Sequence, residues 1–317
     1  MLHIPVALDR CIALLAPAIE GAISDHQSAI VIDATLGLAG HTSELLERYP
    51  ELTVIGFDRD LAAIAIAKSR VEKFGSRAII VHSVYDRIEE VLEELHIPHV
   101  DGILFDLGVS SMQLDEADRG FAYSQDAPLD MRMDQSQGIS AFEVLMTYDR
   151  NSLIRILRNY GEEKFAPRIV DRIIAARDSG TLNSTKNLAE IVKESIPAPA
   201  RRTGGNPAKR TFQALRIEVN QELEGLKRAI PAALQALSVN GRLVVMSYQS
   251  LEDKIVKSEF TKVCASGTPR GLPIDLPNSA AKYRLIFSSS ESASQSEIDL
   301  NPRAQSMRLR AVERLAA

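Results

Sequence analysis

Four short apolar runs, each followed by a stretch with helical spacing, constrain the fold of this chain more than any other feature. The runs cover residues 30–35, 53–58, 78–82 and 100–106. Continuous apolar runs of this length are typical of strands buried on both faces, with the intervening helices as cover. This part of the sequence therefore predicts a doubly wound α/β domain built on a parallel sheet.

The alternation of strands and helices stops after Asp106 and resumes near residue 241. Gly, Pro, Ser and Asp are frequent in residues 108–139, which predicts a loop, and the patterns that follow are helical only. The later part of the chain predicts a long helix at 211–237, a strand at 241–248, a helix at 251–263, a strand at 282–288 and an edge strand at 306–314.

These patterns predict one α/β domain that is interrupted by a helical insertion. We expect residues 1–110 to form the first segment of the α/β domain and residues 213–317 to form the second. Residues 111–212 would then form the all-helical insertion. A Ser-rich stretch at 288–296 is expected to be flexible.

The composition is that of an ordinary globular protein, with 317 residues of which 45% are hydrophobic and 25% charged. No stretch approaches the roughly 18 uninterrupted apolar residues of a membrane span. The two cysteines, Cys11 and Cys264, cannot form a disulfide framework, which indicates a reducing compartment. We therefore expect a soluble, cytoplasmic protein without a membrane partner.

The net charge of −5 is unevenly distributed along the chain. Residues 1–110 contain 8 Lys/Arg and 17 Asp/Glu, whereas residues 197–216 contain basic residues and no acid. A local basic segment is a candidate for contact with phosphates, although a solvated loop would have the same composition. The basic residues of this segment are Arg201, Arg202, Lys209, Arg210 and Arg216.

Polar residues follow the first two apolar runs where each strand should end. Asp33 and a turn through Gly37 and Gly40 follow the first run, and Asp58 ends the second. Ligands of open α/β sheets bind beyond the carboxyl ends of the strands, and small residues let the backbone approach them closely. A carboxylate at Asp58 can accept both hydroxyls of a ribose. The combination favours a nucleoside cofactor over the alternatives of a plain turn and a helix N-cap.

The glycine turn narrows the choice of cofactor. The sequence from Gly37 to Thr42 matches neither the Gly-x-Gly-x-x-Gly of dinucleotide sites nor the Gly-Lys-Ser/Thr of a P-loop. Methyltransferases on this kind of sheet use a looser glycine turn with the same acidic residue, so S-adenosylmethionine fits better. Tyr85, just past the third run, is either an aromatic neighbour of the adenine or a capping residue at a helix start.

Asp106 ends the fourth run at the centre of the predicted sheet, beside the expected position of the donor methyl. Amines conjugated to a ring are poor nucleophiles because their lone pair is delocalised. A carboxylate that accepts the N–H bonds would favour a pyramidal amine and assist loss of a proton. Asp106 is therefore a candidate catalytic residue, and the alternative that it only binds the cofactor stays open.

Other features limit the chemistry. Carbon-5 methylation of a pyrimidine needs a cysteine nucleophile, and both cysteines lie outside the region of the fourth strand. The one close pair of histidines, His96 and His99, is split by a proline in a turn, so we expect no metal site. Ser250 with Asp253 predicts a helix cap after the fifth strand.

Strings of unusual sequence occur over nearly the whole chain. They are His3–Val6, Asp33–Gly37, Asp101–Asp115, Arg119–Phe121, Pro128–Asp134, Tyr160–Glu163, Arg210–Asn220, Ser250–Asp253 and Asn301–Arg303. Together they resemble the bacterial small-subunit rRNA cytosine-N4 methyltransferase family known as RsmH or MraW.

The resemblance implies a class I methyltransferase sheet and an enzyme that methylates the exocyclic N4 amine of a specific cytidine in the decoding region of 16S rRNA. The methyl donor would be S-adenosylmethionine. The helical insertion is similar to the family's substrate-recognition domain, which gives the basic residues of 197–216 an RNA-facing role. The cofactor contacts carried over by motif are Ala39, Gly40, His41, Asp58, Tyr85, Asp106 and Gln113.

Some positions depart from the family pattern. Ala39 replaces the first glycine of the usual Gly-Gly-His turn, and Tyr85 stands where the family generally has phenylalanine. Asn206 and Gln249 stand where histidines are typical. If those histidines have a role in the family, other residues or a different contact must perform it in this chain.

Two other functions stay open on the sequence alone. A methyltransferase of DNA amines or small molecules would share the sheet, although the basic segment favours structured RNA. A non-enzymatic RNA-binding factor would keep the sheet without its chemistry, which the presence of Asp58 and Asp106 disfavours. The expected partner is small-subunit rRNA or the assembled small ribosomal subunit, and a homodimer is left open.

Overall fold

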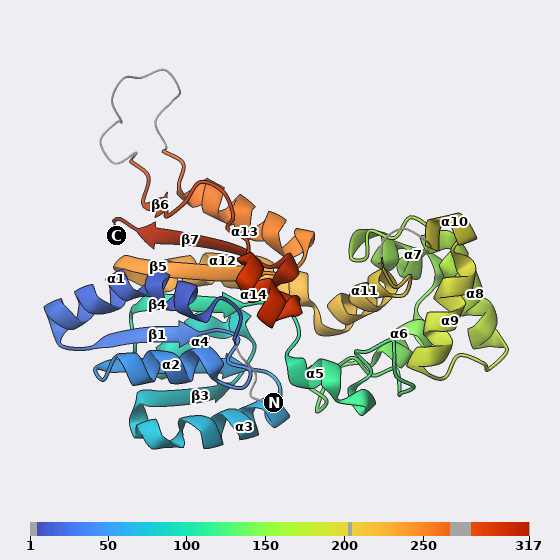
Figure 1. The fold of residues 1–317 in the computed structure, drawn as a ribbon, viewed down its shortest axis with the longest axis horizontal. Helices are drawn as coiled ribbons and strands as arrows, with labels where there is room; N and C mark the ends of the chain where they lie inside the picture. Colours follow the sequence, from blue (N-terminus) through green and yellow to red (C-terminus); the bar gives the residue numbers. More distant parts are fainter. Residues whose placement is uncertain (1–4, 202–204, 267–279, 317) are drawn as a thin grey trace. The chain divides into compact units, whose positions relative to one another are not determined.

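The computed structural model describes residues 5–201, 205–266 and 280–316, which fall into two compact units. Unit 1 comprises Met1–Gly108 with Leu223–Ala317, and unit 2 comprises Val109–Glu222. The second boundary lies beyond residue 212, because the helix that ends at Asn220 packs on two helices of unit 2. Figure 1 gives the order of the elements along the chain.

The described part of unit 1 is built on a seven-stranded sheet in the order β3-β2-β1-β4-β5-β7-β6. The strands from β3 to β5 are parallel, and β7 runs antiparallel to both of its neighbours. The strands are β1 Ala29–Asp33, β2 Leu52–Asp58, β3 Ala78–His82, β4 Val100–Asp106, β5 Leu237–Ser247, β6 Tyr283–Leu285 and β7 Arg308–Arg314.

Helices cover both faces of this sheet, which confirms the predicted doubly wound fold (Figure 1). Helices α1 and α2 pack on the face that carries Val31 and Leu104, and α4, α12 and α13 pack on the face that carries Ile32 and Phe105. The helices of unit 1 are α1 Leu8–His26, α2 Gly40–Arg48, α3 Leu61–Val71, α4 Ile88–Glu94, α12 Glu222–Ala236, α13 Ser250–Val263 and α14 Gln295–Leu300, with short 3-10 turns η1 Glu72–Arg77, η2 Tyr85–Arg87 and η4 Pro302–Ser306.

The register of the parallel strands aligns their polar ends. Asp33 pairs with Gly56 on one side and with Leu104 on the other, so Asp58 and Asp106 each lie two residues further along. Because side chains alternate between the faces of a strand, Asp33 and Asp106 belong to the same face of the sheet. The carboxyl edge of the sheet therefore gathers these carboxylates, as the sequence predicted.

The end of the chain differs from the sequence expectation. β7 is not an edge strand, because it pairs with β5 on one side and with β6 on the other. The Ser-rich stretch contains defined contacts, since Glu291 forms a bridge with Leu309 and α14 begins at Gln295. Long-range pairing of this kind leaves no local signal in a Ser-rich sequence.

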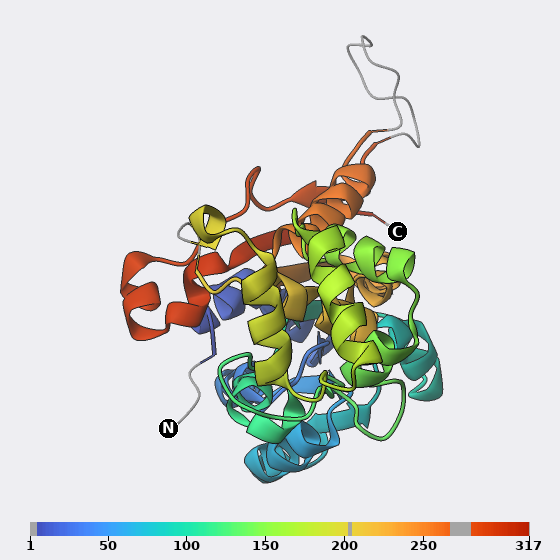
Figure 2. The ribbon, with the colours of Figure 1, turned by 90° about the vertical axis from the view of Figure 1, so that its right-hand side faces the viewer.

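Unit 2 is helical and has its own hydrophobic core. α7 packs against α8 and α11, and α8 packs against α9; these helices are the green and yellow ribbons of Figure 2. The helices of unit 2 are α5 Ser111–Asp115, the 3-10 turn η3 Ala117–Arg119, α6 Ala141–Thr147, α7 Arg150–Asn159, α8 Ala166–Asp178, α9 Thr185–Ser195, α10 Ala198–Arg201 and α11 Lys209–Asn220.

The prediction of a single long helix at 211–237 is wrong. This segment is divided into α11 and α12 at Gln221, whose left-handed backbone (φ 50°, ψ 36°) ends the first helix. The residue at this position is neither glycine nor proline, and the helical hydrophobic pattern continues past it. The sequence therefore does not indicate that the helix ends here.

Within the described residues, no helix is both long enough and apolar enough to cross a bilayer.

Candidate active site

The turn after β1 is held together by Asp33, whose side chain is buried. Its Oδ2 accepts a hydrogen bond from Thr42 Oγ1 at 2.7 Å, and its Oδ1 accepts from the backbone N–H of Thr35 at 3.3 Å. Burial raises the pKa of Asp33, although the nearby charge of His41 and the bond from Thr42 oppose this shift. The Thr35 hydroxyl in turn accepts the backbone N–H of Asp106 at 2.6 Å, which ties β1 to the end of β4.

The residues from Gly37 to His41 form the turn that leads into α2. Gly37 has φ 50°, and Ala39 is a buried N-cap residue with a left-handed backbone (φ 57°), a conformation in which a side chain is disfavoured. Gly40 has no room for a side chain, because a Cβ there would collide with the ring of Pro5. His41 lies buried with its Nε2 3.1 Å from the carbonyl oxygen of Val6. Pro5 and Val6 therefore lie against the start of α2.

Asp58 at the end of β2 binds the glycine turn directly. Its Oδ2 accepts the backbone N–H of Gly37 at 2.7 Å, and its Oδ1 accepts that of Asp60 at 2.8 Å. Burial raises the pKa of Asp58 to about 6, and these two bonds act in the opposite direction. The alternative that Asp58 caps a helix is wrong, because the side chain of Asp60 caps α3 by accepting from Ala62 at 3.1 Å.

Tyr85 begins the short turn after β3, and its ring meets Phe105 edge to face with centroids 5.6 Å apart. A Cβ at Gly225 of α12 would lie in ordinary contact with the ring of Tyr85 at 3.6 Å, so α12 passes beside the tyrosine. Tyr85 does not cap α4, whose N-cap is Arg87. The ring is half-buried at the same edge of the sheet as the end of β2.

Asp106 ends β4, and its side chain is half-buried. Oδ1 accepts a hydrogen bond from the hydroxyl of Tyr248 at 2.7 Å. Burial raises the pKa of Asp106, the charge of His41 and the tyrosine hydrogen bond lower it, and the charge of Asp33 raises it further. This edge therefore brings together Asp33, Asp58, Asp106, His41 and Tyr85 from five separate segments of unit 1.

Gln113 belongs to unit 2, where its side chain is buried in a capping box at the start of α5. The side-chain Oε1 of Gln113 accepts the backbone N–H of Ser110 at 3.1 Å. The backbone N–H of Gln113 donates to the Ser110 hydroxyl at 3.2 Å. A cofactor contact by Gln113 stays a prediction from the family resemblance.

The predicted RNA-facing residues have different surroundings in unit 2. Lys209 and Arg210 are exposed at the start of α11, whereas Arg201 is half-buried with its Nε donating to the carbonyl of Ile196 at 2.6 Å. Arg216 forms a two-bond ion pair with the buried Glu222, at 2.8 and 2.9 Å. Its guanidinium thus has a structural partner, contrary to the RNA-facing expectation. Arg202 lies outside the described residues.

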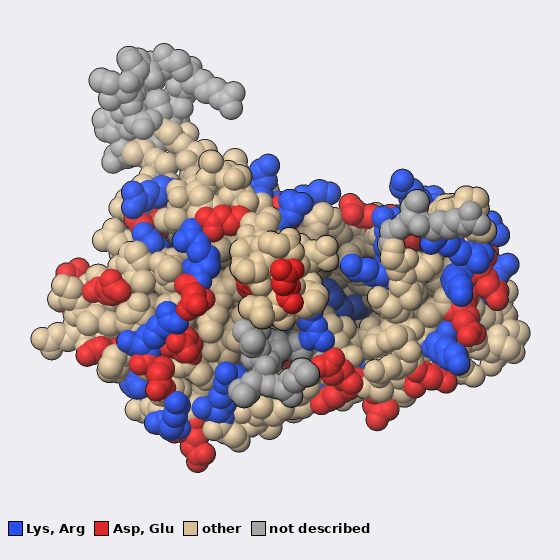
Figure 3. Space-filling model, in the orientation of Figure 1, with Lys and Arg blue, Asp and Glu red and all other residues tan. Residues whose placement is uncertain are grey.

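Figure 3 shows the distribution of charge on one face of the molecule. Over unit 2, basic side chains gather in the region that α8, α9 and α10 occupy in Figure 1, with acidic side chains between them. Part of this charge is neutralised locally, since Arg172 pairs with Glu194 and Arg150 pairs with Asp171.

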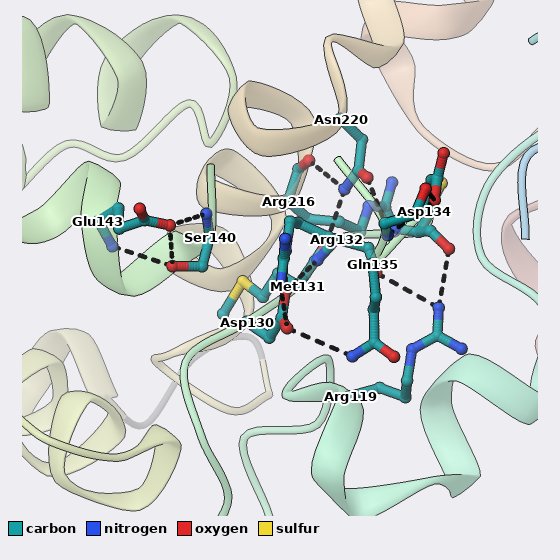
Figure 4. A network of polar contacts seen from close by, with 12 residues as sticks. Arg119, Asp130, Met131, Arg132, Asp134, Gln135, Ser140, Glu143, Arg216 and Asn220 are labelled. Carbon is teal, nitrogen blue, oxygen red and sulfur yellow. Dashed lines mark hydrogen bonds and ion pairs between the residues drawn. The ribbon is translucent and has the colours of Figure 1, made fainter. Parts of the chain in front are cut away.

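Three of the segments that resemble the family contact one another in unit 2 (Figure 4). They are Arg119–Phe121, Pro128–Asp134 and Arg210–Asn220. Asn220 accepts the backbone N–H of Met133 at 2.8 Å and donates to the carbonyl of Met131 at 2.7 Å. Arg119 donates to the carbonyl of Met133 at 2.9 Å. A Cβ at Gly120, which has φ 74°, would collide with the carbonyl of Pro128. These contacts tie the loop that precedes α6 to η3 and to the end of α11.

The two positions where histidine is typical have local roles in this chain. Gln249 is the N-cap of α13 in a capping box with Glu252, so the cap predicted at Ser250 with Asp253 is one residue too late. Asp253 instead binds Arg310 at 2.6 and 3.1 Å. Asn206 Oδ1 accepts the backbone N–H of Ala208 at 2.9 Å, just before α11.

Sequence reasoning missed Thr35, Thr42 and Tyr248, all of which contact the acidic strand ends. Thr35 and Thr42 flank the glycine turn, and this proximity could have marked them. Tyr248 is 142 residues from Asp106, and only its place at the end of the fifth strand could have suggested it. Among the described residues, no group of three His, Cys, Asp or Glu side chains could hold a metal ion.

A doubly wound sheet with a glycine turn and acidic ends on β1, β2 and β4 defines an α/β enzyme of the methyltransferase class. Residues 1–315 match the MraW methylase family, and the chain belongs to this family. The expected fold class and the expected methyltransferase activity are thereby confirmed.

Relatives match over almost the whole chain. The ribosomal RNA small subunit methyltransferase H of Mycolicibacterium smegmatis is 54% identical over 313 residues, which cover 99% of this chain and 84% of that protein. The protein of the same name from Renibacterium salmoninarum is 53% identical, with 99% of this chain and 95% of that protein covered.

The solved structures that match this chain include an rRNA methylase from Streptococcus thermophilus. The match has 12% sequence identity and a TM-score of 0.44, and it covers 99% of both chains. NSun6 from Pyrococcus horikoshii, in a complex with SFG, has 12% identity and a TM-score of 0.38, with 97% of this chain and 52% of that chain covered.

Proposed function

We propose that this methylase transfers a methyl group from S-adenosylmethionine to the exocyclic N4 amine of a cytidine in the decoding region of small-subunit rRNA. Membership of the MraW methylase family and the names of relatives 53–54% identical support this assignment. The observation that carries it is the placement of Asp58 and Asp106 at one edge of the sheet, around the turn from Gly37 to His41.

The residues of this edge fit a nucleoside cofactor. Each oxygen of the Asp58 carboxylate accepts one backbone N–H and keeps a lone pair for a ribose hydroxyl. Two hydroxyl donors would stabilise a carboxylate that burial otherwise disfavours in its charged form. Gly37 and Ala39 bring the backbone close to the ligand, and the half-buried ring of Tyr85 would flank the adenine.

Asp106 would act on the acceptor amine. Bound S-adenosylmethionine would supply an electrophilic methyl group to the nitrogen of this amine. The Asp106 carboxylate would accept a hydrogen bond from an N–H of the amine, which localises the lone pair on nitrogen. It would then take up the proton that the methylated, positively charged nitrogen must lose. The partial burial of Asp106 would strengthen this interaction, because fewer water molecules compete for the carboxylate.

Unit 2 would bind the RNA around the target. Lys209 and Arg210 are exposed cations at the start of α11, whereas Arg216 is occupied by Glu222. A base in folded rRNA must leave its stack before its exocyclic amine can reach the cofactor. We assign phosphate contacts to Lys209 and Arg210, which predicts salt-sensitive binding.

The test uses small ribosomal subunits from cells that lack this gene. The purified protein is incubated with them and isotopically labelled S-adenosylmethionine, and the digested rRNA is analysed by mass spectrometry. Labelled N4-methylcytidine at one site is expected. Label in another nucleoside, in DNA or in a small molecule would instead support a methyltransferase of another substrate class. Binding of RNA without cofactor binding would support a non-enzymatic factor. The same assay on naked rRNA decides between the two forms of the substrate.

A further inference from the structure

The side chain of Tyr248 extends from the end of β5 to the carboxyl group at the end of β4. Its hydroxyl donates to Asp106 Oδ1 at 2.7 Å. We propose that Tyr248 is a positioning residue for methyl transfer, which holds the Asp106 carboxylate by Oδ1 and leaves Oδ2 to accept an N–H of the acceptor amine. This inference rests on the proposed function of Asp106.

The sheet itself places the tyrosine beside the carboxylate. Asp106 pairs with Met246 in the parallel ladder, and the N–H of Leu107 donates to the Met246 carbonyl at 3.0 Å. Tyr248 is two residues beyond Met246, so alternation places it on the same face as Asp106. A Cβ at Gly108, which has φ 105°, would lie 3.6 Å from the tyrosine ring. The chain after β4 therefore runs close to the ring.

The backbone of Tyr248 is fixed independently of its side chain. The buried Glu252 accepts the N–H of Tyr248 at 2.9 Å and that of Gln249 at 3.2 Å, both through Oε2. The Gln249 side chain holds the other oxygen, with its Nε2 2.8 Å from Oε1. Since both its backbone and its hydroxyl are anchored, the tyrosine can restrict the orientation of the carboxylate.

The carboxylate has a well-defined set of neighbours. In the part of unit 1 that the structure describes, Tyr248 is the side chain that donates to Asp106, and Thr35 fixes the backbone of Asp106 from β1. The titratable groups that act on it from other elements are His41 at the start of α2 and Asp33 at the end of β1. Burial and then the charge of Asp106 raise the pKa of the Cys11 thiol in α1. A neutral hydroxyl donor orients the carboxylate without adding a second charge.

The hydrogen bond has a consequence for pH dependence. Burial raises the pKa of Asp106, and the Tyr248 hydroxyl lowers it by binding the charged form. Removal of the hydroxyl therefore raises this pKa further. If the ionised carboxylate assists the amine, activity in the variant is lost at a higher pH as the solution is acidified.

The experiment compares Tyr248→Phe with Tyr283→Phe, using the methylation assay on undermethylated small subunits. The control loses a tyrosine hydroxyl that donates at 2.7 Å to the backbone carbonyl of Leu234. For Tyr248→Phe we expect kcat to fall about 10- to 100-fold. We also expect the acid limb of its pH profile to move to higher pH, because the hydroxyl that lowers the pKa of Asp106 is gone. The dissociation constant for S-adenosylhomocysteine should stay within about threefold of the original protein, because the bond serves the amine and not the ribose. Tyr283→Phe should keep kcat and pH profile.

A double-mutant cycle makes the test specific to the pair. In an Asp106→Asn background, Tyr248→Phe should cause little additional loss of kcat, since the group that it positions is already altered. Full additivity, or an unchanged kcat and pH profile in Tyr248→Phe alone, would overturn the inference while leaving the proposed function intact. If the unaltered protein labels no cytidine in any form of the subunit, the proposed function fails and this inference falls with it.

Discussion

Acidification of the solution from pH 7 to pH 5 should weaken binding of S-adenosylhomocysteine through protonation of Asp58. Burial raises the pKa of this carboxyl group from 3.8 to about 6, so the group gains a proton as the pH falls through about 6. Only the ionised form offers both oxygens as acceptors to the two ribose hydroxyls. The affinity for S-adenosylhomocysteine is therefore greatest above pH 7, and it declines as the pH falls below the pKa of Asp58.

The size of the effect follows from the fraction of ionised carboxylate. With a pKa of about 6, that fraction is roughly nine-tenths at pH 7 and one-tenth at pH 5, so the dissociation constant should rise about tenfold. Isothermal titration calorimetry at half-unit intervals between these pH values measures it. Below pH 6 the slope should approach one tenfold change per pH unit.

Asp58→Asn provides the control, because it keeps the shape of the side chain and removes the titration. Asp33 and Asp106 also have raised pKa values, and their contribution would persist in this variant. We expect Asp58→Asn to bind more weakly at pH 7 and to show a much flatter profile. A dissociation constant for the original protein that changes less than twofold between pH 7 and pH 5 would refute the assignment of the ribose to Asp58. The same steep profile in the variant would also refute it.

Further predictions concern unit 2. Gly120→Ala should lower the free energy of unfolding by roughly 3 kcal/mol or more, because φ 74° disfavours a side chain and the new Cβ meets a backbone carbonyl. Gly138→Ala, at φ 75° with open space around it, should cost only about 1 kcal/mol. Asn220→Ala should cost about 2–4 kcal/mol, since it leaves buried backbone groups without partners. Lys209→Gln with Arg210→Gln should weaken RNA binding and reduce the slope of log affinity against log salt by about 1 to 2.

Matched controls separate these effects from general damage. Asn183→Ala removes an exposed asparagine from the same unit and should leave the urea midpoint almost unchanged. Arg150→Gln with Arg172→Gln removes two cations that are already paired with acids, so the salt slope should change little. Equal slopes for the two double variants would contradict the placement of phosphate contacts at Lys209 and Arg210. Equal losses at Gly120 and Gly138 would contradict the collision argument.

The strands of the parallel sheet and the acidic residues at their ends could be predicted from the pattern of residues alone. Buried parallel strands need continuous apolar residues, and this requirement is visible over five or six neighbouring positions. The end of each run is equally local, so Asp33, Asp58 and Asp106 could be assigned to one edge of the sheet. The position of Tyr85 just past the third run marked it as well, and the family resemblance added His41 in unit 1 and Gln113 in unit 2.

The contacts between side chains of different strands could not be predicted in this way, because they depend on how the folded chain pairs its strands. The contact between Tyr248 and Asp106 depends on the pairing of β4 with β5, which the inserted unit 2 separates by more than a hundred residues. The pairing of Arg216 with Glu222 depends likewise on the left-handed residue Gln221, where α11 ends without a glycine. Hydrophobic periodicity reports which face of an element is buried, but it carries no information about the partner on that face. Strand order, register and chain reversals supply that information, and they exist only once the whole chain has folded.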